Sequence, residues 1–219
     1  MKTNSAIRQE ALALMKGNWG SAVLVTVALY LIIIICAVVS TTIGTMIGGD
    51  IPIGNFIGQI LSLLTTILVS YPILFASMML FLHFVRGEQK LYIGGLFKVF
   101  SKPYYGKSIG VFLLMYVFTF LWTLLLIVPG IIKSLAYSLA PFILADNPEL
   151  SANQAINESM KMMKGHKMDL FLIMLGYVGF ALLSILALGI PLLWVVPYYQ
   201  AVLAKFYEEV KADYTPTAC

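Results

Sequence analysis

The sequence predicts an all-α, polytopic membrane protein with six transmembrane helices, kinked return helices and short interfacial amphipathic helices. Three observations predict this class. Of the 219 residues, 60% are hydrophobic and only 11% are charged, whereas a soluble domain has about 25% charged residues. The charges are confined to short segments, and the apolar runs between them are long enough to cross a bilayer. This composition excludes a disordered chain and a disulfide scaffold.

Long uncharged runs predict the spans. A helix needs about 20 apolar residues to cross about 30 Å of hydrocarbon. The runs divide at clusters of turn-forming residues, of which 48–55 and Gly189-Ile190-Pro191 are the clearest. The six spans that result are 21–46, 57–84, 109–128, 131–145 and the two halves of 170–204.

The fourth span and the last two are short. Residues 131–145 follow a turn expected at Pro129-Gly130 and carry Lys133 near their start, and we expect this lysine to reach the outer interface. Residues 170–204 exceed one span, and a single tilted helix of that length is unusual. Two short helices joined at Gly189 are therefore expected.

Basic residues predict the orientation, because cytoplasmic loops carry an excess of Lys and Arg. With six spans, 13 of the 14 basic residues lie on the same side as both termini, and Lys133 alone lies opposite. Without the fourth span, the lysines at 161, 164 and 167 would lie outside. We therefore expect a multi-pass protein of the cell (cytoplasmic) membrane with both termini cytoplasmic.

Three basic segments on that side resemble one another, and each precedes an odd-numbered span. They cover residues 6–19, 96–107 and 155–167. An amphipathic helix at the membrane interface is expected for each, and the alternative is a basic loop that only satisfies the orientation rule. The third helix is introduced by a capping box at Ser151 to Gln154. Its apolar face consists of Ala152, Ala155, Ile156, Met160 and Met163.

Each even-numbered span contains a proline next to an aromatic residue. A proline frees a backbone carbonyl and bends a helix, so we expect a kink at each, with Ser70, Ser138 and Tyr199 as candidate partners. The three prolines are Pro72, Pro141 and Pro197.

The repeated pattern predicts one integral membrane domain, 1–219. It is built from three degenerate units, each an interfacial helix followed by a helical hairpin. The units cover about 1–87, 88–147 and 148–211.

Two segments carry a family resemblance. The first is Met1-Lys2-Thr3-Asn4-Ser5-Ala6-Ile7-Arg8, continuing to Lys16-Gly17-Asn18-Trp19; the second is Tyr137-Ser138-Leu139-Ala140-Pro141-Phe142-Ile143-Leu144-Ala145-Asp146-Asn147-Pro148, continuing to Lys164-Gly165-His166. With them the chain resembles the bacterial membrane family catalogued as domain of unknown function 975. The second segment is also similar to the membrane domain of glycerophosphodiester phosphodiesterases. The resemblance implies a bacterial cytoplasmic-membrane protein and brings no activity or site residues.

Groups that could support catalysis do not converge in the sequence. Neither His83 nor His166 has a carboxylate or cysteine at ligand spacing. Cys36 and Cys219 are read as free thiols, because a bridge would draw the tail into hydrocarbon. We therefore expect no enzyme activity, no cofactor, and no catalytic, cofactor-binding or metal-binding residue.

Two function classes follow. The first is a non-catalytic scaffold or accessory subunit of the bacterial inner membrane, acting through helix packing and a basic cytoplasmic face. The alternative is a permease-like carrier of a small neutral or amphiphilic, lipid-like molecule. Its polar lining would be the stripe Ser62, Thr66 and Ser70, which packing between helices explains more simply.

Partners follow from the same charge pattern. We expect anionic headgroups of membrane lipids on the cytoplasmic side, and a membrane protein partner or a homo-oligomer. No nucleic acid is expected, because topology and anionic lipid account for the lysines.

Overall fold

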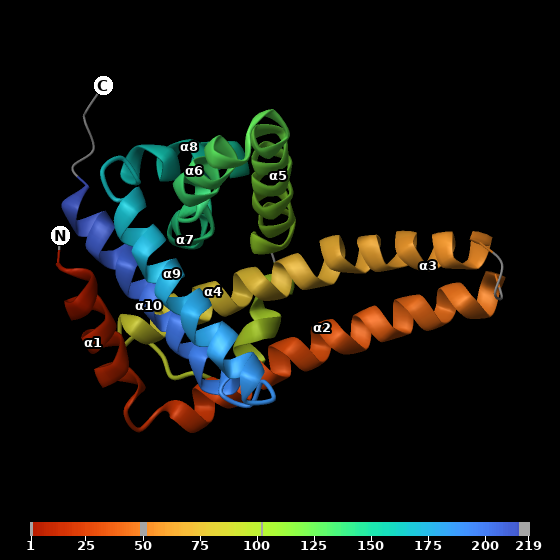
Figure 1. Ribbon diagram of the computed structural model, residues 1–219, viewed down its shortest axis with the longest axis horizontal. Helices are drawn as coiled ribbons and strands as arrows, with labels where there is room; N and C mark the ends of the chain where they lie inside the picture. Colours follow the sequence, from red (N-terminus) through yellow and green to blue (C-terminus); the bar gives the residue numbers. More distant parts are fainter. Residues whose placement is uncertain (1, 49–51, 102, 215–219) are drawn as a thin grey trace.

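A computed structural model describes residues 2–48, 52–101 and 103–214 of the chain (Figure 1). Throughout these residues the structure is helical and contains no strand, as the sequence predicts. The elements are α1 (Asn4–Met15), α2 (Trp19–Gly48), α3 (Pro52–Thr65), the π-helix η1 (Thr66–Ser70), α4 (Tyr71–Val85), the 3₁₀ helix η2 (Ile93–Phe100), α5 (Tyr104–Leu125), α6 (Ile127–Tyr137), α7 (Ala140–Asp146), α8 (Ala152–Met162), α9 (Lys167–Leu186) and α10 (Leu192–Asp213).

The helices form three hairpins. In the first, α2 lies beside α3 and the pair extends away from the other helices as an arm (Figure 1). In the second, α5 packs against α6, and in the third α9 packs against α10. We call α4, α7 and α10 the return helices, because each completes a hairpin.

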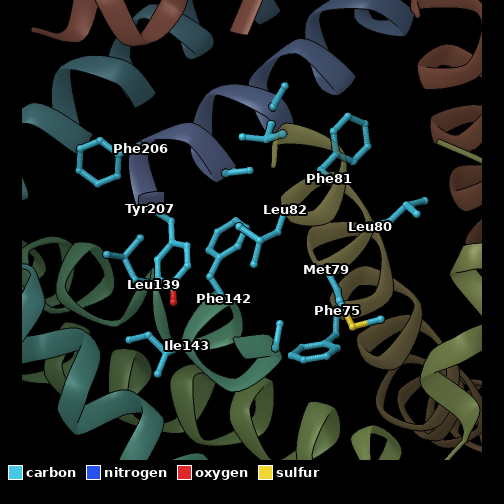
Figure 2. Packing of buried hydrophobic residues seen from close by; sticks show 14 of the residues in the cluster. Phe75, Met79, Leu80, Phe81, Leu82, Leu139, Phe142, Ile143, Phe206 and Tyr207 are labelled. Atoms are coloured by element: carbon cyan, nitrogen blue, oxygen red, sulfur yellow. The ribbon is translucent and has the colours of Figure 1, made fainter. Parts of the chain in front are cut away.

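The return helices meet in a common hydrophobic core. It contains Phe75 and Phe81 of α4, Phe142 of α7, and Phe206 and Tyr207 of α10. Figure 2 shows the ring of Phe142 facing that of Tyr207, and the two ring centres lie 5.4 Å apart. Residues from three distant parts of the chain thus form one buried centre.

Two helices expected at the interface cover this core with their apolar sides. Ile7, Ala11 and Met15 of α1 are fully buried. In α8, Ala155 and Ile156 are buried too, and the predicted capping box between Ser151 and Gln154 is formed. The apolar face of α8 therefore packs on protein. Whether these helices lie parallel to a membrane stays a prediction.

Five segments of the described chain are long and apolar enough to cross a membrane, which indicates a multi-pass membrane protein. They are Trp19–Ile47, Asn55–Val85, Tyr104–Leu125, Ile127–Asp146 and Lys167–Leu186. The sixth predicted span corresponds to the first part of α10. This part ends at Ala204, before Lys205, and at 1.5 Å per residue it is only about 20 Å long. Six crossings therefore stay a prediction.

The turn before the fourth span is wrongly predicted at Pro129-Gly130. The chain turns at Leu126, whose backbone is extended (φ −161°, ψ 142°). Pro129 lies in the first turn of α6, where the missing N–H costs nothing. Gly130 packs so closely on Thr123 that no side chain fits between α5 and α6. The fourth span thus begins at Ile127 and reaches 20 residues.

The other expected turns have two outcomes. Gly189 turns the chain between α9 and α10 with a positive φ of 76°, as predicted. Of the turn cluster at 48–55, residues 49–51 lie outside the described part.

Lys133 lies over the ring of Trp122, with Nζ 4.7 Å from the ring centre. Its position at the outer interface stays a prediction.

Pro72 follows a change in the helical hydrogen bonding. The π-helix η1 ends directly before α4, so the pattern widens just where Pro72 lacks its N–H. The carbonyl of Leu68, four residues earlier, accepts a hydrogen bond from the Tyr105 hydroxyl of α5 at 3.0 Å. A hydroxyl satisfies this carbonyl, as expected, but it is that of Tyr105 and not of Ser70.

Pro141 lies at the start of α7, just after a break that separates α7 from α6. The fully buried Ser159 of α8 bridges the break. Its Oγ donates to the carbonyl of Ala136 at 2.7 Å and accepts from the N–H of Leu139 at 3.2 Å. Ser138 instead donates to Leu135 in its own helix.

Pro197 lies inside α10, which is one continuous helix. The ring of Tyr199, the expected partner, stacks on Tyr177 with ring centres 4.1 Å apart. The structure therefore shows a helical irregularity at Pro72 and at Pro141. The kinks of the return helices stay a prediction.

The Tyr105→Phe variant tests the bond at Pro72. Removal of the Tyr105 hydroxyl leaves the Leu68 carbonyl without this partner, so the free energy of unfolding should fall by about 1 kcal/mol. Tyr116→Phe on the same helix is the control, because that side chain is 63% exposed. Unfolding in mixed detergent micelles measures the difference. Equal stability of the two variants would show that the bond contributes nothing.

Candidate functional site

Arg86 lies directly after α4, at the end of the first return helix. The helix ends here because Gly87 adopts a φ of +75°, the left-handed conformation that terminates helices. The side chain of Arg86 is 19% exposed and points toward α7 and α10, with which it forms ion pairs.

Asp146 is the last residue of α7, and its side chain is only 8% exposed. Its two oxygens accept hydrogen bonds from Nη1 and Nη2 of Arg86, each at 2.7 Å. This paired geometry is the strong form of an arginine–carboxylate contact. It joins the first return helix to the second.

The third return helix contributes Tyr207, Glu208 and Lys211. The Tyr207 hydroxyl and the Lys211 ammonium donate to Oδ2 of Asp146 at 2.7 and 2.6 Å. Glu208 accepts from Nε and Nη2 of Arg86 at 2.9 and 2.6 Å. We call these three residues, together with Arg86 and Asp146, the ion cluster.

The ion cluster balances two cations against two anions. The hydrogen bond to Asp146 raises the pKa of Arg86 above its already high value. Burial raises the pKa of the Tyr207 hydroxyl, and its hydrogen bond to the Asp146 carboxylate raises it further. Both groups therefore keep their protons at neutral pH, so the arrangement is suited to holding helices together and not to proton transfer.

A second group of charges ties α1 to α10. Lys2 Nζ lies 2.7 Å from Glu10 and 2.9 Å from Glu209, and Lys205 lies 3.8 Å from Glu10. The hydrogen bond from Lys2 lowers the pKa of Glu10, and that bond raises the pKa of Lys2. Both charge groups therefore include side chains from the C-terminal half of α10.

Both histidines have carboxylate neighbours, and two of these, Glu88 and Asp169, lie within five residues of the histidine in the sequence. His83 contacts Glu88 across the turn after α4. His166 lies 3.9 Å from Asp169 and 3.4 Å from Asp213, the last residue of α10. Within the described residues no three potential ligands gather at one point that could hold a metal ion. The expected lack of catalytic, cofactor and metal residues stays a prediction.

The predicted polar stripe of the second span is partly buried by packing and partly lines a groove. Ser70 is buried, and the Thr66 hydroxyl donates to the backbone carbonyl of Ser62, one turn earlier in the same span. Ser62 lines an open groove of about 440 Å³ between α2 and α3. On the same interface the hydroxyl oxygens of Ser40 and Thr65 are 2.8 Å apart, and Gly58 lies against Gly44.

Cys36, in the arm, is a free thiol. Cys219 lies outside the described residues.

Sequence reasoning missed the ion cluster. Its signal was nevertheless present, because Arg86 and Asp146 are the first charges after the apolar stretches of two even-numbered spans. Charges of opposite sign at the ends of neighbouring helices are candidates for pairing. Without knowledge of which helix ends are neighbours, the pairing could not be assigned.

The comparisons with known proteins give a family and nothing closer. Neither the curated proteins nor the solved structures contain a match, so the similarity to the membrane domain of glycerophosphodiester phosphodiesterases stays a prediction. A family model matches residues 1–133 and 123–214, which together cover nearly the whole chain. The chain therefore belongs to the family described as "Protein of unknown function (DUF975)".

Proposed function

We propose that this chain is a non-catalytic scaffold or accessory subunit of the bacterial cytoplasmic membrane, acting through helix packing and a basic cytoplasmic face. The ion cluster is the observation that carries the proposal. It joins the ends of three return helices through mutually satisfied charges, so the titratable groups that converge in this fold serve its architecture. A rigid platform is what a scaffold needs at its docking face.

Exposed lysines in the segments expected on the cytoplasmic side support a basic docking surface. Lys16, Lys90, Lys98 and Lys164 are all exposed. Near an anionic leaflet each lysine contributes about 1 kcal/mol of attraction. Such a face suits anionic headgroups, an acidic surface of a membrane protein, or a second copy of the chain.

Purification from the native membrane in mild detergent, followed by mass spectrometry, tests the proposal. We expect a protein partner in stoichiometric amount with wild type. The partner should be lost from a Lys90→Glu/Lys164→Glu variant, because that variant reverses the charge of the docking face. A Lys133→Glu variant is the control, because Lys133 is expected on the opposite side. A partner that is retained equally by both variants would contradict a role for the basic face.

Cysteine labelling tests the orientation on which this proposal depends. In a Cys36→Ser/Cys219→Ser background, a single cysteine at position 55 should react with an impermeant reagent added from outside. A single cysteine at position 166 should react only after the membrane is opened. Labelling of position 166 from outside would overturn the proposed topology.

The alternative is a permease-like carrier of a small neutral or amphiphilic molecule. The groove between α2 and α3 supports it, because Thr41, Thr45, Asn55, Gln59 and Ser62 give it a polar lining. Co-purification of a small molecule, lost on substitution of Gln59 by leucine, would favour the carrier over the scaffold.

A further inference from the structure

Arg8 of α1 reaches across to α9. Its Nη2 donates to the carbonyl of Leu172 at 3.0 Å, and Asn4, one turn earlier, donates to the carbonyl of Asp169 at 3.2 Å. The guanidinium lies directly over Gly176, where an added Cβ would be 2.8 Å from Nη2. The missing side chain at Gly176 is what gives the guanidinium its place.

The Arg8 guanidinium is part of the wall of a small cavity between α9 and α10, which we call the Arg8 pocket. The cavity has a volume of about 40 Å³. A water needs about 10–15 Å³, so the cavity has room for about three water-sized groups, enough for the two unesterified oxygens of a lipid phosphate. The other lining residues used here are Tyr177 and Phe180 of α9, and Tyr198 of α10. Phe180 is largely exposed, so the pocket adjoins an apolar surface.

The charge of Arg8 is not balanced by a carboxylate. Across the described ranges no acidic side chain pairs with it, and a backbone carbonyl is its one hydrogen-bond acceptor there. A guanidinium carries five N–H donors, so most of them are left for another ligand. The other basic side chains of this region differ, because Lys2 and Lys205 both pair with Glu10.

The position of the Arg8 pocket along α9 indicates why the unpaired charge of Arg8 needs a ligand. Leu172 lies five residues after Lys167, the first residue of α9, which places its carbonyl about 8 Å along the helix. If α9 crosses the membrane, this level is near the boundary between headgroups and hydrocarbon, and Gly176, one turn further along α9, is nearer the hydrocarbon. A charged side chain there is costly unless it has a partner, and tyrosines such as Tyr177 and Tyr198 are enriched at that boundary.

We propose that the Arg8 pocket binds the phosphate of an anionic phospholipid, with the acyl chains lying along the exposed apolar side of α9. The guanidinium supplies the paired N–H donors that match two phosphate oxygens. The proposal rests on the proposed function only in placing the chain in a membrane with anionic lipid. A lipid held here would join α1 to the third hairpin.

Native mass spectrometry of the full chain, titrated with phosphatidylglycerol, tests this site. Wild type should retain one phosphatidylglycerol molecule per chain more strongly than any further lipid molecules that bind. Arg8→Gln should weaken this binding about tenfold or more, since charged hydrogen bonds are lost. Arg8→Lys should fall between the two, because it keeps the charge and loses the paired geometry. Lys133→Gln, which removes one positive charge outside the basic docking surface, is the charge control and should behave as wild type.

A glycine pair provides the steric test. Gly176→Ala should weaken the lipid binding without any change of charge, because its methyl group displaces the guanidinium. Gly179→Ala on the same helix meets nothing within 4 Å and should bind as wild type. Thermal unfolding of each variant establishes that it is folded. Lipid binding unchanged in both Arg8→Gln and Gly176→Ala would overturn the proposal.

Two further binding measurements identify the ligand. Phosphatidylcholine should bind more weakly than phosphatidylglycerol, and equal binding would overturn the anionic specificity. Inorganic phosphate should displace the lipid poorly, because it has no acyl chains. Efficient displacement would identify a free phosphate as the ligand and contradict the lipid. Failure of this site leaves the scaffold proposal standing, since that proposal is judged by its protein partner.

Discussion

The Asp146→Asn variant is expected to lower the free energy of unfolding by about 3 kcal/mol. The side chain is nearly the same size, so the change removes a charge and leaves the packing in place. Arg86, Lys211 and Tyr207 then lose the carboxylate on which they converge. Removal of one partner from a buried pair is costly because the remaining charge stays in a poorly solvated site.

The measurement is detergent-induced unfolding of the purified protein, with Glu88→Gln as the matched control. Glu88 is paired with His83 on the surface, and its side chain is 50% exposed. An exposed pair contributes at most about 1 kcal/mol, so the control should stay close to wild type. A second background, Arg86→Gln, completes a double-mutant cycle. Strictly additive losses for Arg86→Gln and Asp146→Asn would show that the pair is not coupled.

The Ser159→Ala variant is expected to cost about 2 kcal/mol, because two buried backbone groups lose their partner at once. These are the carbonyl of Ala136 and the N–H of Leu139, on either side of the break before Pro141. The loss should appear in the same unfolding measurement.

Ser138→Ala is the control for this break. Its hydroxyl bonds only to Leu135 in its own helix, so its loss leaves no group unsatisfied across the break. A Ser159→Cys variant keeps a weak donor of similar size and should lie between alanine and wild type. Equal stabilities for Ser138→Ala and Ser159→Ala would show that the bridge from α8 does not support the break.

Much of the fold follows from the sequence because run length and turn chemistry are local signals. The hairpins, the capping box at Ser151 and the turn at Gly189 all arise from residues close together in the chain. The fourth span is four residues longer at its start than predicted, since Pro129 reads as a turn although it is equally suited to the first turn of a helix.

The features that sequence reasoning missed depend on contacts between distant residues. Arg86 is 60 residues from Asp146 and 122 from Glu208, and no periodicity connects such positions. The same applies to Tyr105, which lies 37 residues after the carbonyl it satisfies. Ser159 gives a partial signal, because it is a polar residue on the apolar face of α8. Apolar faces accept a serine only where its hydroxyl finds a partner.

The arm of α2 and α3 divides the molecule into regions that should open independently. Beyond the core these two helices pack chiefly on each other, and Met46, near the end of α2, is 79% exposed. Local opening of such a region requires little of the protein's own packing to be broken. Amide hydrogen exchange should therefore be fast in the arm and slow in the core when the protein is in a short-chain detergent. In a bilayer, where lipid excludes water from the arm, its protection should rise toward that of the core.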